Sequence, residues 1–156
     1  QVGPASQDSM PPEMVVPRDS IIDVSASMDA NGRLTWDVPE GKWTVKEILL
    51  HISDDERIFA YRALRFARND ATALPGFEQD DYTAASNANA RPIKSILKEL
   101  ATVRQATLTL FNSFDRKALQ RAGMANGNTM SVRAAAYHIA GHEIHHINLI
   151  KEKYLK

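Results

Sequence analysis

Three long segments of this chain repeat apolar residues at the spacing of an amphipathic helix, and this pattern constrains the fold more than any other feature. The segments cover residues 44–67, 91–114 and 131–154. Apolar residues recur every three or four positions in each, which places them on one stripe of a helix. Helices of this length bury their stripes most simply in an antiparallel bundle, so we expect a mainly α fold.

Local signals indicate where these helices begin. Thr44 followed by Glu47 is a capping-box pattern, and Ser131 is a favourable N-cap residue. Pro92 suits the first turn of the middle helix. We expect the first helix to end at about Ala67 and the last at about Tyr154.

The connections between the helices differ in length. Residues 69–90 are rich in Asn, Asp, Ala and Thr, and we expect a long loop there. It is either a packed surface connector or a functional segment whose part from Leu74 to Tyr82 shapes a pocket. After the middle helix, Arg116 to Ala122 predicts a short helix. Turn signals follow at Gly123 and at residues 126–128.

The N-terminal part reads differently. Four prolines within residues 1–20 exclude a continuous helix and predict an extended tail. Residues 21–40 alternate apolar and polar on both sides of Asn31-Gly32, which predicts a β-hairpin. Residues 41–156 then form the helical domain. Three helices leave an apolar seam, and we expect the hairpin or a second chain to cover it, so a homodimer is the expected assembly.

Composition excludes several classes of protein. The 19 Lys and Arg balance the 19 Asp and Glu, so the basic surplus that favours nucleic-acid binding is missing. We find neither an apolar run long enough for a membrane span nor a secretory signal, and we expect a cytoplasmic protein without membrane or nucleic-acid partners. The absence of cysteine excludes thiolate zinc sites, so His, Asp or Glu must hold any metal.

The five histidines are concentrated in two of the predicted helices. His51 lies in the middle of the first, and the other four lie in the last at 138, 142, 145 and 146. His142 and His146 are four residues apart, so their side chains share one helix face. A third imidazole from a facing helix would give three ligands and an open position, as in catalytic zinc sites. The alternative is that each histidine is an ordinary core residue hydrogen-bonded to a neighbour.

The other residues near the histidine positions allow two readings each. Asp54 and Asp55 either orient His51 or lie on a solvated face. Arg62 and Arg65 either clamp a carboxylate or form surface salt bridges.

A protease motif is only partly present in the last helix. His142, Glu143 and His146 fit the H-E-x-x-H pattern of zinc proteases, in which the glutamate is the general base. The downstream histidine ligand is missing. Glu152 is a candidate for the third ligand, but its spacing from His146 is shorter than in that arrangement. We therefore expect Glu143 to be a surface or helix-pairing carboxylate. His138 is an accessory candidate, and His145 faces the bundle edge.

Four stretches resemble the DinB-like superfamily: GKWTVKEILLH at 41–51, ERIFAYRALRFARND at 56–70, LPGFEQDDY at 74–82 and GHEIHH at 141–146. The resemblance implies a four-helix bundle in which His51, His142 and His146 bind a divalent metal, zinc or nickel. It also implies a metal-dependent hydrolase or a thiol-dependent transferase that acts on a small-molecule substrate. The metal would lower the pKa of a bound water or thiol.

The upstream segment departs from that family. Residues 18–43 resemble a hairpin segment of rhamnosidase-type glycoside hydrolases, and Gly41 to Thr44 fit both patterns, as in a fusion joined there. The main alternative function is a non-catalytic helical module for dimerisation or partner binding, with a degenerate metal site. A carbohydrate-binding fragment is a third reading, which depends on the hairpin alone.

Overall fold

The structure of this protein is a computed structural model, of which residues 38–154 are described. The expected tail at 1–20 and nearly all of the expected hairpin at 21–40 lie outside the described residues. Residues 38–40 lead into a turn that precedes the first helix and contain no strand.

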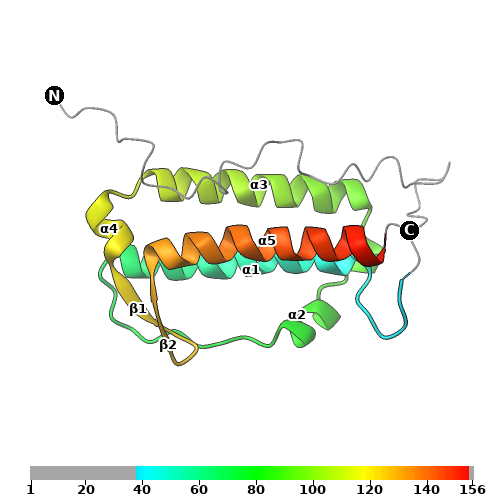
Figure 1. Cartoon of the computed structure of the whole chain (residues 1–156), viewed down its shortest axis with the longest axis horizontal. Coiled ribbons are helices and arrows are strands. Elements are labelled where there is room, and N and C mark those ends of the chain that lie inside the picture. The colour runs from blue at the N-terminus through cyan, green and yellow to red at the C-terminus, as the bar shows by residue number, and fades with distance from the viewer. Residues whose placement is uncertain (1–37, 155–156) are drawn as a thin grey trace.

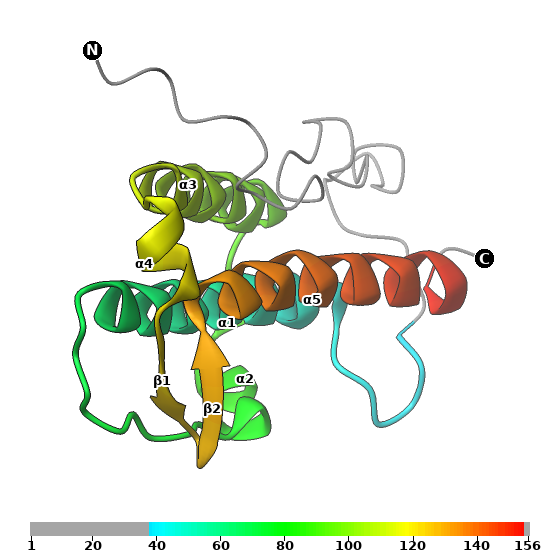
Figure 2. The ribbon, with the colours of Figure 1, turned by 60° about the vertical axis from the view of Figure 1, so that its left-hand side comes forward.

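Three long helices form the body of the molecule, as expected: α1 (Val45–Ala67), α3 (Ile93–Asn112) and α5 (Val132–Lys153). They run side by side along the longest axis (Figure 1). Helix α1 packs against both α5 and α3. The two views agree that α3 lies on one side of the α1–α5 pair (Figure 2). Helix α1 is therefore the element through which the three helices share a core.

The helix ends follow the local signals in the sequence. The backbone N–H of Glu47 donates to Thr44 Oγ1 at 3.2 Å, and the Thr44 N–H donates to Glu47 Oε2 at 2.7 Å, which completes the predicted capping box. Ser131 caps α5 by accepting from the N–H of Ala134 at 3.0 Å. Pro92 occupies the N-cap of α3, one position before its expected place.

The connection from α1 to α3 contains two short helices, so the prediction of one long loop was wrong there. Helix α2 covers Gln79–Ala85, and a 3-10 turn, η5, covers Ala88–Ala90. Only Thr83 and Ala88 are buried in these two elements, so no apolar periodicity was available to predict them. Asp80 and Asp81 lie in the first turn of α2, where negative charge stabilises a helix.

A small hairpin precedes α5 and was not predicted. Helix α4 (Arg116–Gln120) ends before Ala122, and β1 (Ala122–Ala125) pairs antiparallel with β2 (Asn128–Ser131). Asn126 and Gly127 have φ of 50° and 73°, which suits a two-residue hairpin turn. The strands are short and lack an alternating apolar pattern, so only their turn was visible in the sequence.

The hairpin also holds the segment that follows α1. The Leu74 N–H donates to the Met124 carbonyl at 2.9 Å, and the Asn126 N–H donates to the Leu74 carbonyl at 3.0 Å. Figure 2 shows this segment passing the hairpin on its way to α2. The backbone around Leu74 is therefore fixed in place by hydrogen bonds.

The apolar core is divided into two clusters. One includes Phe66 and Phe111, and the other includes Ile48 and Ile150. Buried polar residues from α1 and α5 lie between them along the chain: His51, Asp55, Glu56 and Glu143. Buried polar groups require partners, so this layer is where chemistry is expected.

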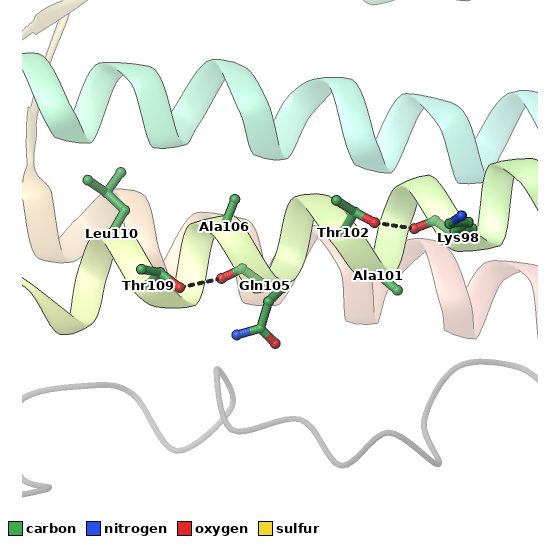
Figure 3. Close-up of a pocket in the computed structure, with 7 residues that line it drawn as sticks. All are labelled: Lys98, Ala101, Thr102, Gln105, Ala106, Thr109 and Leu110. Atoms are coloured by element: carbon green, nitrogen blue, oxygen red, sulfur yellow. Dashed lines mark hydrogen bonds between the residues drawn. The ribbon is translucent and has the colours of Figure 1, made fainter.

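An open groove of about 730 Å³ runs along the outer face of α3, between Lys98 and Leu110 (Figure 3). The hydroxyls of Thr102 and Thr109 donate to backbone carbonyls one turn earlier, at 2.8 and 2.9 Å. The homodimer stays a prediction. No helix within residues 38–154 is both long and apolar enough to cross a membrane.

Candidate metal site

The structure brings together the three histidines that the sequence singled out. His51 comes from α1, and His142 and His146 come from successive turns of α5. Their nitrogens converge: Nε2 of His142 lies 3.0 Å from Nε2 of His51 and 3.1 Å from Nε2 of His146. All three can offer one nitrogen within 4.8 Å of the others. The geometric requirement for a shared cation is met.

Burial keeps these imidazoles neutral. It lowers the pKa of His142 to about 4, although the charge of Asp55 opposes the shift. It also lowers the pKa of His146 to about 3, assisted by the charges of His142 and His51. The pKa of His51 is lowered by burial as well, against Asp55 and Asp80. Neutral imidazoles keep the lone pairs that metal ligands need.

Two further contacts close the end of the site near His51. The Trp43 ring lies beside the His51 ring, with centroids 5.0 Å apart. The Tyr154 hydroxyl donates to the Trp43 carbonyl at 2.8 Å, which ties the end of α5 to the start of α1. The Trp43 ring therefore packs against one side of the His51 ring.

Asp55 lies next to His142. Both predictions for Asp55 were wrong, because it neither orients His51 nor lies on a solvated face. Its Oδ2 lies 3.4 Å from Nδ1 of His142 and 2.9 Å from Nε2 of His138. Asp55 is only 4% exposed, so its charge is not dispersed by water. That charge favours the proton on Nδ1 of His142 and leaves the lone pair on Nε2, which faces the other two histidines. Asp54 instead lies 3.6 Å from Arg57 in an ordinary ion pair.

His138 joins the site as an accessory residue, as expected. Besides its contact with Asp55, its ring stacks on Phe59 with centroids 3.6 Å apart. His145 and Glu152 are exposed. Neither belongs to the group of convergent nitrogens.

Glu143 lies beside His142 in the sequence but serves a different side of the helix. Its Oε2 accepts a hydrogen bond from Arg104 of α3 at 2.6 Å. Arg104 also makes a two-point contact with Glu56 of α1, at 2.9 and 3.0 Å. Glu143 is therefore a helix-pairing carboxylate and cannot act as the general base of a protease-type site.

The Arg104 contacts fix the rotation of the helices that carry the site. Glu56 and Glu143 each follow a site residue, Asp55 and His142, by one position. Burial acts to lower the pKa of Arg104, but its hydrogen bonds and charge contacts with Glu56 and Glu143 raise it overall. Holding these carboxylates on the α3 side directs the preceding residues towards each other.

A divalent cation fits this donor set. Ligands about 2.0–2.1 Å from a tetrahedral zinc ion lie about 3.3 Å from one another. The two distances from His142 Nε2 to the other imidazole nitrogens, 3.0 and 3.1 Å, are close to this value. The lone pair of His142 Nε2 has two imidazole nitrogens at hydrogen-bond distance but can accept only one proton. A cation between the rings would use all three lone pairs at once.

Sequence reasoning missed two residues here. Asp80, at the start of α2, is close enough for its charge to act on His51. Arg104 was not singled out because a lone arginine on an amphipathic helix gives no signal. The expected pocket segment, Leu74 to Tyr82, did contain Asp80, but nothing in its spacing distinguished that carboxylate.

Comparison with known proteins identifies the family to which this helical bundle belongs. The family model of the DinB superfamily matches residues 23–150, most of the chain. The chain belongs to the DinB superfamily. The match begins upstream of Gly41, where the fusion was predicted. The resemblance to glycoside hydrolases stays a prediction.

One protein similar in sequence and one similar in structure illustrate the resemblance. The "Putative metal-dependent hydrolase OB0413" of Oceanobacillus iheyensis is 25% identical over 114 residues, which cover 72% of this chain and 65% of that protein. This chain therefore spans less than two thirds of the relative's length. The second is the structure described as "YfiT from Bacillus subtilis is a probable metal-dependent hydrolase with an unusual four-helix bundle topology". It matches with a TM-score of 0.64 and 15% identity, over 90% of this chain and 79% of that one. At this identity the second match shows the fold alone.

Proposed function

We propose that this protein is a metal-dependent hydrolase whose divalent cation is held by His51, His142 and His146. The observation that carries the proposal is the convergence on one point of three neutral imidazoles from two helices, of which His51 is buried and the other two are half-buried. The names of the two relatives above support the reaction class. Zinc and nickel are the proposed ions because both accept imidazole nitrogen.

The residues of this chain have separate tasks in such a site. The three histidines supply ligands and leave a coordination position open for water or substrate. Asp55 holds the proton of His142 on the outer nitrogen. A divalent ion bound there would lower the pKa of a water molecule towards 7, which makes it a nucleophile at neutral pH.

Thiol transfer is the finer alternative within the same chemistry. The chain has no cysteine, so a thiol would have to come from a small-molecule cofactor. The ion would then acidify the thiol in place of water. Turnover of an activated ester without added thiol supports the hydrolase, whereas turnover that requires a thiol supports the transferase.

Metal analysis tests the proposal. We expect about one zinc or nickel ion per chain in the purified or reconstituted protein, and an equimolar loss in a His142→Ala variant. His145→Ala is the matched control, since it removes an exposed histidine from the same helix. It should keep the metal.

The opposite result supports the non-catalytic alternative. A protein that takes up neither ion, and whose unfolding temperature does not change with chelator, would be a helical binding module. Its histidines would then be core polar residues, and the hydrolase proposal would be wrong.

A further inference from the structure

A cavity lies further along α1 from the metal site, between α1 and the segment anchored by the hairpin. Its volume is about 540 Å³. Tyr61, Arg62 and Arg65 of α1 line one side, and Phe77 and Tyr82 line the other. The Phe77 and Tyr82 rings lie 5.1 Å apart, centroid to centroid. The cavity therefore combines aromatic walls with arginine side chains.

One of these arginines is buried without a counter-ion. Arg62 is only 5% exposed, and its Nη2 donates to the carbonyl of Pro75 at 3.1 Å. That is the one hydrogen bond of its guanidinium within residues 38–154, and no carboxylate of these residues lies at ion-pair distance from it. A guanidinium has five N–H donors, so most of its capacity is unused.

The neighbouring arginines are in a different state. Arg65 is bound by Asp70 and Tyr61. Arg57, which also lines the cavity, is bound by Glu99 at 2.6 Å. Arg62 is therefore the arginine of this cavity that has no described carboxylate at ion-pair distance, although the charge of Asp55 acts on it from farther away.

The contacts that Arg62 does make hold it in place. Its guanidinium carbon lies 4.8 Å from the centre of the Phe59 ring and 6.0 Å from that of Phe77, both within cation–π range. Such contacts offset part of the cost of burying a charge, but they leave the edge donors unpaired. A fixed guanidinium with free edge donors at a cavity wall is suited to a planar anion.

The cavity and the metal site share one face of α1. His51, Asp55, Phe59 and Arg62 follow each other at steps of four, four and three residues, and all four are buried. At a rise of 1.5 Å per residue, Arg62 lies about 16 Å along the helix from His51. Phe59 connects the two regions, because His138 stacks on it and Arg62 lies over it.

We propose that this cavity binds a carboxylate group of the substrate, with Arg62 as the specificity-determining residue and the aromatic side chains holding an apolar body. The inference rests on the proposed function, because the carboxylate of the substrate would bind on the same face of α1 as the metal site where the substrate reacts. The single unpaired guanidinium matches one negative charge. A phosphate dianion would need a second cation, and Arg57 and Arg65 are already paired.

Binding of 3-phenylpropionate, measured by titration calorimetry on metal-stripped full-length protein, tests the inference. With the metal removed, the carboxylate of the acid cannot bind to a metal ion at the histidine site. The result is therefore independent of whether the protein is a metalloenzyme. We expect Arg62→Gln to weaken binding at least tenfold, and the neutral amide of the same acid to bind at least tenfold more weakly to the wild type. Arg65→Gln is the matched control, and it should change the affinity less than threefold.

Three outcomes would overturn the inference. These are equal binding of the acid and its amide, equal binding by wild type and Arg62→Gln, and tighter binding of inorganic phosphate than of the acid. If Arg62→Gln does not fold, the wild type still decides the matter. Addition of the acid should shift the NMR signal of the Arg62 Nε–H group, and an unchanged signal would contradict the proposal.

Discussion

Asp55→Asn offers the sharpest test of how the histidine site is organised. The substitution keeps the size of the side chain and removes the charge beside Nδ1 of His142. Asparagine can present its amide nitrogen to the ring, which would favour the wrong tautomer and turn the lone pair away from the site. We therefore expect the metal affinity to fall while the fold is retained.

The geometry sets the expected size of the loss. Removing the partner of a metal-bound histidine lowers affinity by about 10–100-fold, or about 1.4–2.7 kcal/mol. Asp55 is buried, which favours a large effect, but its 3.4 Å separation from His142 Nδ1 is longer than a good hydrogen bond. We expect a loss of about tenfold for this reason.

Competition with a chromophoric chelator measures the affinity for zinc and nickel. Asp54→Asn is the control, because this neighbouring aspartate pairs with Arg57 and forms no hydrogen bond or ion pair with His142 among the described residues. It should change the affinity less than about twofold. A loss below about threefold in Asp55→Asn, or equal losses in both variants, would refute the tautomer argument.

Two predictions concern stability. Arg104→Met leaves the buried carboxylates of Glu56 and Glu143 without a cation and should lower the free energy of unfolding by about 3–5 kcal/mol at pH 7, measured with urea; a change below about 1 kcal/mol would contradict the buried network. The free energy of unfolding of the metal-free protein should fall by about 2–4 kcal/mol when the pH is lowered from 7.5 to 5. The pKa values of His142 and His146 are about 4 and 3 in the folded protein and return to 6.5 on unfolding. In this pH range, therefore, only the unfolded chain gains protons. The fall should begin near pH 6.5, and a flat profile in urea unfolding would show that these histidines are not buried neutral.

The local sequence determined the secondary structure wherever its signals were strong. The capping box at Thr44 and the serine at 131 set the starts of α1 and α5 because capping depends on residues within one turn. The short elements α2 and β1–β2 were missed because their apolar faces are too small to produce a period. In β1–β2 the Asn126-Gly127 turn was the only local clue.

The sequence also predicted the histidines as metal ligands, because the i,i+4 spacing of His142 and His146 places two imidazoles on one helix face in any tertiary structure. It could not decide which residue of another helix would face them, because that depends on how α1 is rotated against α5. The packing of the helices determines this rotation. Arg104 holds Glu56 and Glu143 towards α3, and Asp55 of α1 then contacts His142 of α5. The unpaired state of Arg62 likewise depends on distant segments, since the position of every carboxylate around it is set by the fold and not by neighbours in the chain.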